Sequence, residues 1–506
     1  MYGNNTIVTG DNKDVAAWLF ERSMSDPGFV AGFCQANVGD TSPNINGAYC
    51  EYGEDVGQQC DFEHSLCGNK SQPCRGRGPY YGLDDAGTAS TYEIEERQFE
   101  AAKALFLDTA AFILVAGKPV RSVHQFVDFS TYHFALANGT MVKTCPAALG
   151  YSFAAGTTDG SGAFDFQQAD PGDPNANPLW AYVGNLLHSP NDTQKECQGV
   201  KPILLDIGES NTPYQWAPNI VDIQLLRVGQ FFIVVSSGEA TTMSGRRWRE
   251  AVQSAVANTF GDLNDTEPVV VLGGPANSYT HYFATTEEYS IQRYEGASTL
   301  YGPHTLDAHL TLSAELLPYL DTTASNLPPL YPGPSPPINV NNSLSFITGV
   351  VVDNPPFLKS FEDQKTAPNP TYRAGDSISV TFVGANPRND FRLEGTFAAV
   401  DRFGFKTMTW KQVRDDSDWG LLFEWKRTST VLGTSEVIIT WETKWEADSW
   451  RPTPVLSADH SDQLARQVRL RGLYRIRYNG DSKSIGGTIS GFQGVSSEFR
   501  IQCHVY

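Results

Sequence analysis

The sequence predicts an α/β domain followed by an all-β sandwich of immunoglobulin-like type. In residues 1–326, amphipathic helical segments alternate with short apolar runs that are typical of buried strands. In residues 327–337, six of the eleven residues are proline, which favours an extended, semi-rigid linker. In residues 338–506, helical periodicity is nearly absent and apolar residues alternate with polar ones. We therefore predict a first domain over 1–326, a linker over 327–337 and a β-domain over 338–506.

The composition limits the partners that the protein can have. Its 506 residues include 37 lysine and arginine residues against 57 aspartate and glutamate residues, a net charge of -20. Such a surface argues against a nucleic-acid partner. An uncharged lipid remains compatible with it, because such a substrate needs an apolar groove rather than a basic face. No run reaches the roughly 18 to 20 apolar residues that span a bilayer, so no transmembrane segment is predicted.

The first elements lead to a polar loop. Residues 14–25 have the apolar spacing of a helix, and the apolar run 29–34 predicts a buried strand. The loop 37–44 follows, in which Gly39 permits a tight backbone and polar side chains crowd around the hydroxyl of Ser42. An Asx-rich turn without chemistry is the alternative interpretation of this loop.

The pattern of helices and strands continues along the first domain. The predicted elements are a helix over 95–115 with a Glu-rich first turn, β-structure over 120–136 with a turn at 138–139, an irregular segment at 150–160 that either lines a site or is a plain surface loop, strands over 223–228 and 231–235, a helix over 244–260, a strand over 268–272 and a helix over 303–317. Between the last two, Thr285 and Glu288 form a capping-box signature, and Tyr289 and Tyr294 would lie on the helix that it starts.

The β-domain shows period-two patterns. Ile378, Val380 and Phe382 alternate with serine and threonine. The alternating run 474–478 precedes Asn479-Gly480, which predicts a hairpin turn at that point.

Cysteines and sequons indicate a secreted glycoprotein. Four of the eight cysteines, Cys50, Cys60, Cys67 and Cys74, lie within 25 residues in a Gly-rich polar stretch, which favours two disulfide bonds in an oxidising compartment. A four-cysteine zinc site is the alternative. Cys145 and Cys197 bracket a later segment and are plausible partners. The Asn-x-Ser/Thr sequons are at Asn4, Asn69, Asn138, Asn191, Asn264 and Asn341.

Three stretches place reactive groups just past predicted strands. They are the loop with Ser42, the dipeptide Gly238-Glu239, and residues 279–282, which include His281 and Tyr282. If the strands are neighbours in one sheet, these groups converge. Otherwise Glu239 is a helix-entry carboxylate and Tyr282 an aromatic packed at the sheet edge. The sequence contains neither an HExxH motif nor a G-x-S-x-G elbow.

Four stretches carry a resemblance to the neutral/alkaline ceramidase family. They are NVGDTSPN at 37–44, LGYSFAAGT at 149–157, GEATTMSGRR at 238–247, and YTHY at 279–282 continuing to QRYEGASTLYG at 292–302. The match runs in order along nearly the whole chain, including the proline-rich linker and the β-domain.

This resemblance implies zinc-dependent hydrolysis of the amide bond of ceramide, at a membrane surface, to a sphingoid base and a fatty acid. It implies that Ser42 is the nucleophile, that Glu239 and Tyr282 are Zn²⁺ ligands, and that Tyr289 or Tyr294 holds the substrate oxygen. It also implies disulfide pairs between Cys50 and Cys67, Cys60 and Cys74, and Cys145 and Cys197.

The family's other zinc ligands are histidines upstream of the loop 37–44, and only 36 residues precede that loop here. We therefore expect a chain that lacks the N-terminal part of the catalytic domain and has an incomplete zinc site. Two alternatives follow. One is a catalytically inactive, secreted binding or structural fragment. The other is a metal-independent serine amidase, in which His281 would be the base.

Overall fold

The chain forms two compact units, Met1–Leu344 and Ser345–Tyr506. The structure is a computed structural model, which describes residues 10–26, 28–83, 87–112, 115, 119–168, 178–263, 266–339, 349–350, 352–393, 395–418, 420–443 and 470–502. None of the helices in these ranges is long and apolar enough to cross a membrane. The predicted domain boundaries at residues 326 and 338 stay predictions.

A four-stranded sheet in the order β11-β9-β8-β3 lies at the centre of the first unit. Its strands are β3 (Val120–Asp128), β8 (Ile220–Val228), β9 (Phe231–Val235) and β11 (Val269–Gly273). The strands β9 and β11 are parallel, and the other two pairings are antiparallel. The sheet is therefore mixed, and the carboxyl ends of β9 and β11 lie at the same edge.

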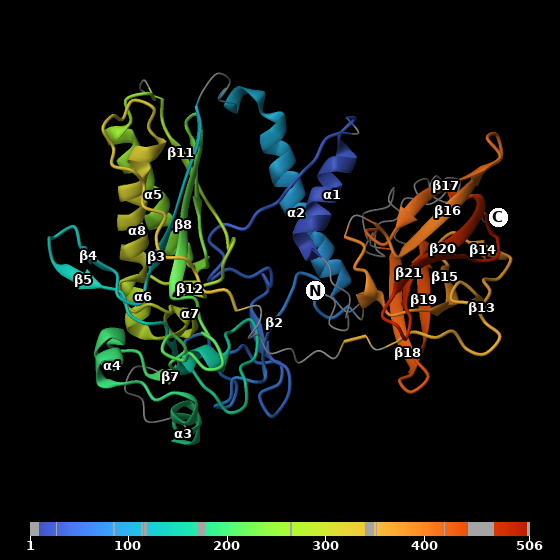
Figure 1. Cartoon of the computed structure of the whole chain (residues 1–506), viewed down its shortest axis with the longest axis horizontal. Coiled ribbons are helices and arrows are strands. Elements are labelled where there is room, and N and C mark those ends of the chain that lie inside the picture. The colour runs from blue at the N-terminus through green and yellow to red at the C-terminus, as the bar shows by residue number, and fades with distance from the viewer. Residues whose placement is uncertain are drawn as a thin grey trace. The chain divides into compact units, whose positions relative to one another are not determined.

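Two helices supply the other layer of this core. They are α5 (Thr242–Thr259) and α8 (Thr305–Leu316), which contact each other and lie alongside the sheet (Figure 1). Trp248, Val252 and Val256 face the core from α5 because they recur at helical spacing. The Nε1 of Trp248 donates to the Ser313 hydroxyl at 2.9 Å, which satisfies the polar atom of this buried ring.

The remaining α-helices and strands of the first unit lie outside these two layers. The helices are α1 (Asp11–Ser23), α2 (Thr88–Leu107), α3 (Pro178–Leu187), α4 (Asp192–Gln198), α6 (Thr286–Ile291) and α7 (Tyr294–Ser298). The strands are β1 (Ala48–Cys50), β2 (Cys74–Gly76), β4 (His133–Ala135), β5 (Met141–Lys143), β6 (Leu149–Gly150), β7 (Ile203–Leu205), β10 (Glu239–Ala240) and β12 (Tyr282–Phe283).

Two predictions near the N-terminus are wrong. Residues 29–34 form no strand, and the Val30 side chain is 81% exposed; Phe29 packs against Phe20 and Phe106 instead. The helix predicted over 95–115 begins at Thr88, so its glutamates lie inside α2 rather than in the first turn, where no acidic residue occurs. Glu95 is completely buried. An apolar run by itself therefore shows neither that a segment is buried nor that it has a strand partner.

The proline-rich segment runs along the sheet of the first unit. The backbone N–H of Phe126 in β3 donates to the Pro332 carbonyl at 2.9 Å. Gly333 has φ +84, and a Cβ there would lie 1.7 Å from the Phe126 carbonyl oxygen. Only glycine fits this close approach, which covers the free edge of β3.

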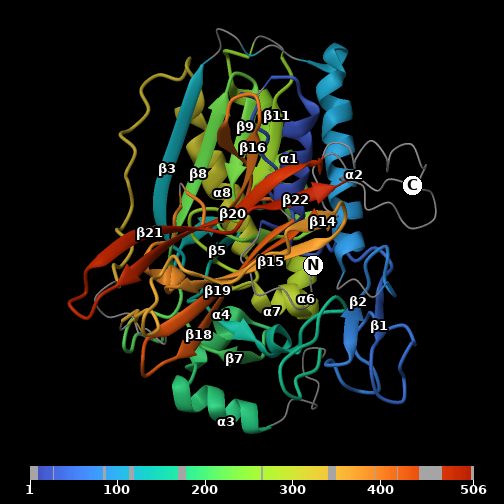
Figure 2. The same ribbon diagram turned by 90° about the vertical axis from the view of Figure 1, so that its right-hand side faces the viewer.

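The second unit consists of two sheets around one core. Their orders are β13-β15-β19-β18 and β14-β22-β20-β16-β17, with β21 also paired to β20 (Figure 2). The strands are β13 (Gln364–Thr366), β14 (Thr371–Arg373), β15 (Ser377–Gly384), β16 (Ala398–Gly404), β17 (Thr409–Asp415), β18 (Leu421–Ser429), β19 (Thr434–Glu442), β20 (Gly472–Lys483), β21 (Ile489–Val495) and β22 (Phe499–Gln502). Ile378, Val380 and Phe382 are fully buried in that core, as their alternation predicts. The immunoglobulin-like type stays a prediction.

The turn predicted at Asn479-Gly480 is wrong. The strand β20 continues through both residues, and Gly480 pairs with Phe492 of β21. A Cβ at Gly480 would lie 2.4 Å from the Phe492 ring and 2.5 Å from the Tyr478 hydroxyl. This glycine makes room for two aromatic side chains rather than for a turn.

Candidate active site

The ends of β9 and β11 bring Glu239 and Tyr282 together. Each of these strands is followed by a short extension, β10 and β12, and the two extensions pair in parallel with Glu239 opposite Tyr282. The Glu239 N–H donates to the His281 carbonyl at 2.7 Å. The two predicted metal ligands are therefore cross-strand neighbours, because their parent strands are adjacent and parallel.

Phenol groups surround the Glu239 carboxylate. The Tyr279 hydroxyl donates to its Oε1 at 2.6 Å, and the Tyr282 hydroxyl also bonds the Glu239 side chain. The hydroxyls of Tyr294 and Tyr282 share a hydrogen bond, and their rings are edge-to-face with centroids 5.3 Å apart. The result is one carboxylate with three phenols, of which Tyr282 is 9% exposed.

The electrostatics of this cluster favour neutral phenols. Burial raises the pKa of Tyr282, and the neighbouring Tyr294 and Glu239 raise it further. Burial and the hydrogen bond to Glu239 raise the pKa of Tyr279 in the same way. The phenols thus donate to the carboxylate, and a nearby cation is needed to make either of them a phenolate.

The loop 37–44 is tied to the start of α5, directly after Glu239. The Gly39 N–H donates to the Ala240 carbonyl at 2.9 Å, and Asn37 Nδ2 donates to the Thr242 carbonyl at 3.3 Å. The Asp40 Oδ1 accepts from the backbone N–H and the hydroxyl of Thr242, both at 2.7 Å. Asp40 thus satisfies a free N–H at the positive end of α5.

The Ser42 hydroxyl has a carboxylate partner. Its Oγ donates to Asp159 Oδ1 at 2.7 Å and accepts from the Asn44 N–H at 3.0 Å. The Asn44 side chain donates to the same Asp159 oxygen at 2.6 Å. The sequence did not predict this role of Asp159; it left open whether the segment 150–160 lines a site or is a plain surface loop. The pattern gives no register between two loops 117 residues apart.

The other predicted residues lie in different surroundings. Tyr289 on α6 is 1% exposed, and its hydroxyl donates to the Gln198 carbonyl at 2.8 Å and side chain at 2.9 Å. The capping box of Thr285 and Glu288 forms as predicted. Tyr294, however, begins α7 rather than lying on α6, because Gln292 adopts a left-handed conformation that ends α6. Of the two tyrosines, only Tyr294 contacts Tyr282.

His281 belongs to the aromatic cluster rather than to the serine loop. Its ring lies 5.1 Å from that of Tyr279 and 5.7 Å from that of Phe153. Burial lowers the pKa of His281, and the charge of Lys201 lowers it further. Within the described part of the chain, no histidine hydrogen-bonds Ser42, so nothing in this geometry supports His281 as its base.

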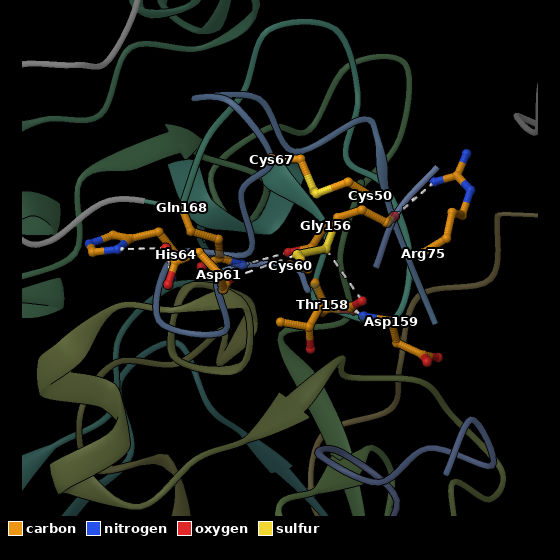
Figure 3. The surroundings of a disulfide bond; sticks show 12 residues. Cys50, Cys60, Asp61, His64, Cys67, Arg75, Gly156, Thr158, Asp159 and Gln168 are labelled. Atoms are coloured by element: carbon orange, nitrogen blue, oxygen red, sulfur yellow. Dashed lines mark hydrogen bonds and ion pairs between the residues drawn. A yellow bond between two sulfur atoms is a disulfide. The ribbon is translucent and has the colours of Figure 1, made fainter. Parts of the chain in front are cut away.

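Three disulfide bonds form the pairs that the resemblance implies. They join Cys50 to Cys67, Cys60 to Cys74, and Cys145 to Cys197. Figure 3 shows the first two beside Gly156, Thr158 and Asp159. Since all four sulfurs of this pair of bridges are oxidised, the four-cysteine zinc site is wrong. Cys34 is free and exposed, and Cys503 lies outside the described residues.

The disulfide-linked segment supports the serine loop. The Gly76 N–H at the end of β2 donates to the Asp159 carbonyl at 3.0 Å, and the Asn46 N–H donates to the Arg77 carbonyl at 3.1 Å. The bridges therefore fix the backbone that holds both Ser42 and Asp159.

Comparison with known proteins identifies the family. The family described as neutral/alkaline non-lysosomal ceramidase, N-terminal, matches residues 1–311, and its C-terminal counterpart matches residues 313–501. The chain belongs to this ceramidase family. Neutral ceramidase 1 of Arabidopsis thaliana is 42% identical over 485 residues, and neutral ceramidase B of Dictyostelium discoideum is 36% identical over 516.

Solved ceramidase structures share the fold. A structure described as ceramidase complexed with C2 matches all of this chain and 68% of its own, at 30% identity and a TM-score of 0.73. The neutral ceramidase of Pseudomonas aeruginosa matches 99% of this chain and 66% of its own, at 28% identity and a TM-score of 0.69.

The match to the Arabidopsis ceramidase covers 94% of this chain but 57% of the relative's length. The match to the Dictyostelium ceramidase covers 99% of this chain but 65% of the relative's length. The expectation that it lacks the N-terminal part of the catalytic domain is not borne out, because the N-terminal ceramidase family matches from residue 1.

The ceramidase family suggests a metal cofactor, and the Glu239 cluster suits one. The Glu239 carboxylate and the Tyr282 phenol lie on adjacent strands and hydrogen-bond each other, and each offers an oxygen atom to a metal ion. Catalytic zinc sites typically use three protein ligands and keep one position open. Glu239 and Tyr282 would supply part of such a set.

Proposed function

We propose that this chain carries a serine amidase site that hydrolyses the N-acyl amide bond of ceramide. The observation that carries the proposal is the Ser42 hydroxyl, which is exposed and hydrogen-bonded to Asp159, on a loop whose backbone is bonded to the residue after Glu239. Membership of the ceramidase family supports the substrate. A serine hydroxyl is a weak nucleophile at neutral pH and needs a proton acceptor in this position.

The reaction proceeds in two halves. The Ser42 Oγ forms a bond to the amide carbon while its proton passes to the Asp159 carboxylate. The C–N bond then breaks as protonated Asp159 gives that proton to the leaving nitrogen, and the sphingoid base departs. Water next attacks the acyl-serine ester while one of its protons passes to the Asp159 carboxylate; the ester C–O bond breaks, Asp159 returns the proton to the Ser42 Oγ, and the fatty acid leaves.

We propose Zn²⁺ as the cofactor, held by Glu239 and Tyr282. When bound, zinc polarises the carbonyl of the scissile amide. Tyr294, which bonds Tyr282, is then the tyrosine placed to hydrogen-bond the substrate oxygen, whereas the Tyr289 hydroxyl is engaged by Gln198.

The test is hydrolysis of a fluorescent ceramide by the purified chain, with and without chelator. We expect Ser42→Ala to reduce kcat by at least ~10³-fold, because the nucleophile is lost. Thr41→Val is the matched control and should keep the activity, because among the described residues the Thr41 hydroxyl donates only to the Val38 carbonyl, at 3.4 Å.

Three results separate the proposals. Turnover that requires Ser42 and stops with chelator supports the zinc amidase. Turnover that requires Ser42 and resists chelator supports a metal-independent amidase. The absence of both turnover and bound zinc supports an inactive binding or structural protein.

We further propose a secreted glycoprotein that acts on ceramide at a membrane surface, with an immunoglobulin-like second unit that positions rather than catalyses. Three disulfide bonds favour an oxidising compartment. The sequon residues Asn69 and Asn138 are exposed. Asn191 is also exposed, but its Nδ2, which would carry a glycan, donates to Glu209; Asn4, Asn264 and Asn341 lie outside the described residues.

A further inference from the structure

A second group of potential metal ligands lies outside the Ser42 and Glu239 site. The donor atoms of His188, Asp206 and Glu209 all lie within 4.8 Å of one another. His188 directly follows α3, and Asp206 directly follows β7. Figures 1 and 2 both place α3, α4 and β7 together at one end of the first unit. None of these three residues takes part in the proposed reaction.

The charges of this cluster are unbalanced. The Asp206 side chain is 0% exposed, and its Oδ2 lies 2.8 Å from His188 Nδ1. Glu209 contacts the same Asp206, and burial together with that carboxylate raises the pKa of Glu209. In the described ranges no lysine or arginine forms an ion pair with either carboxylate. Two carboxylates so close in a partly buried place need a proton or a cation between them.

A buried glutamine points to the same place. Gln194 of α4 is 1% exposed, and its Nε2 donates to the Pro146 carbonyl at 2.8 Å and approaches Asp206 Oδ1 at 3.4 Å. Its Oε1 has no hydrogen-bond partner in the described part of the chain. A buried amide oxygen without a partner is costly, and a cation or a cation-bound water beside Asp206 would satisfy it.

A neighbouring amide orients one of the carboxylates. Asn191 Nδ2 donates to both Glu209 oxygens, at 3.2 and 3.0 Å, while its Oδ1 caps α4 by accepting from the Gln194 N–H. Partners of this kind hold ligating carboxylates in place in metal sites. The Asn191 cap thus connects the cluster to the start of α4.

We propose that His188, Asp206 and Glu209 bind a divalent transition-metal ion of the zinc class, which joins the end of α3 to the turn after β7. One imidazole and two carboxylates make a nitrogen and oxygen set that suits zinc better than calcium or magnesium, which prefer oxygen alone. Donors about 2.0 to 2.2 Å from a tetrahedral zinc lie roughly 3 to 4 Å apart, so small side-chain shifts close the site. The role is structural and separate from catalysis.

The chain offers a matched control. His304 Nδ1 lies 2.9 Å from Asp307 Oδ2, nearly the distance in the His188 pair. Among the residues that the structure describes, no further histidine, cysteine, aspartate or glutamate completes a three-donor group there. His304→Ala removes an equivalent ion pair without touching the proposed site.

The experiment uses the full chain carrying Glu239→Gln and Tyr282→Phe, which removes the other candidate ligands. Zn²⁺ is titrated by calorimetry, and bound metal is measured after dialysis. We expect a single zinc ion per chain and a higher Tm with zinc. His188→Ala and Glu209→Gln should each weaken the affinity for Zn²⁺ by at least ~100-fold. Removing a metal-binding side chain costs more affinity than removing a residue that only hydrogen-bonds to one. His304→Ala should bind as the parent does.

Two results overturn the proposal. One is a parent that binds no zinc, or binds it equally well after His188→Ala and Glu209→Gln. The other is binding of Ca²⁺ alone, independent of His188. Neither result bears on Ser42-dependent turnover, so this inference can fail while the amidase proposal stands.

Discussion

Gly39→Ala tests whether contact between the serine loop and β10 positions the nucleophile. A Cβ at Gly39 would lie 2.9 Å from the Glu239 carbonyl oxygen and 3.0 Å from both the carbonyl carbon and oxygen of Ala240. All three atoms belong to the backbone, so no side-chain rotation relieves the clash. The loop must move away by several tenths of an ångström, which stretches the 2.9 Å bond from the Gly39 N–H to Ala240.

Two effects of Gly39→Ala should lower the free energy of unfolding. Overpacking costs about 1 to 3 kcal/mol, and weakening one hydrogen bond costs about 1 kcal/mol more, so Tm should fall by a few degrees. The rate is more sensitive, because a displacement of ~1 Å at a reacting group can reduce catalysis by ~10²-fold. We therefore expect kcat for ceramide to fall by roughly 10- to 100-fold, with a smaller change in KM.

Gly32→Ala is the control for this experiment. A Cβ at Gly32 has nothing within 4 Å, so the same substitution a few residues earlier should leave both Tm and kcat unchanged. Thermal unfolding and fluorescent-ceramide kinetics measure the two effects. The reasoning is refuted if Gly39→Ala matches Gly32→Ala in both measurements.

Four other predictions follow from single groups. Burial lowers the pKa of His309 to about 3, whereas a histidine in the unfolded chain has a pKa of ~6.5. Between these two pH values the unfolded state binds a proton that the folded state does not. The free energy of unfolding should drop by about 2 kcal/mol from this group between pH 7 and pH 5, and His309→Phe should remove that drop in urea titrations; an unchanged drop would contradict it. Burial raises the pKa of Glu95 to about 9, so the folded state keeps a proton that the unfolded state releases above ~4.5. Stability is thus lost as pH rises, by roughly 3 kcal/mol at pH 7, and Glu95→Gln should raise Tm at pH 8 more than at pH 5; equal shifts would refute this cause. Asp159→Asn should reduce kcat by at least ~10²-fold, because Ser42 loses its proton acceptor, and a wild-type kcat would exclude that role. Asn138 lies exposed at the tip of the β4–β5 hairpin, so protein from a glycosylating host should lose one glycosidase-sensitive mass shift on Asn138→Gln, and an identical shift would show that this sequon is unused.

Local signals in the sequence predicted the elements that local interactions decide. The Thr285–Glu288 capping box forms because its two hydrogen bonds join residues three apart. The alternation at Ile378, Val380 and Phe382 predicted a half-buried strand, since the period of a strand is two. The resemblance supplied the three disulfide pairings, which no spacing rule decides.

Signals that depend on a distant partner were the ones that misled. The apolar run 29–34 packs through Phe29 onto aromatic rings of α1 and α2, and Asn479-Gly480 continues as a strand because Phe492 occupies the space beside Gly480. In both cases packing outweighs a local propensity of about 1 kcal/mol or less.

The sequence by itself determined the longer helices, the strand alternation, the family and the types of group in the site. Only the tertiary structure decided that Ser42 meets Asp159, that Glu239 lies opposite Tyr282, and that His188 meets Asp206. Ser42 and Asp159 come from loops 117 residues apart, and Glu239 and Tyr282 meet because two adjacent parallel strands end at the same edge. Such pairings depend on how separate segments pack and on their register, which no local pattern of residues contains.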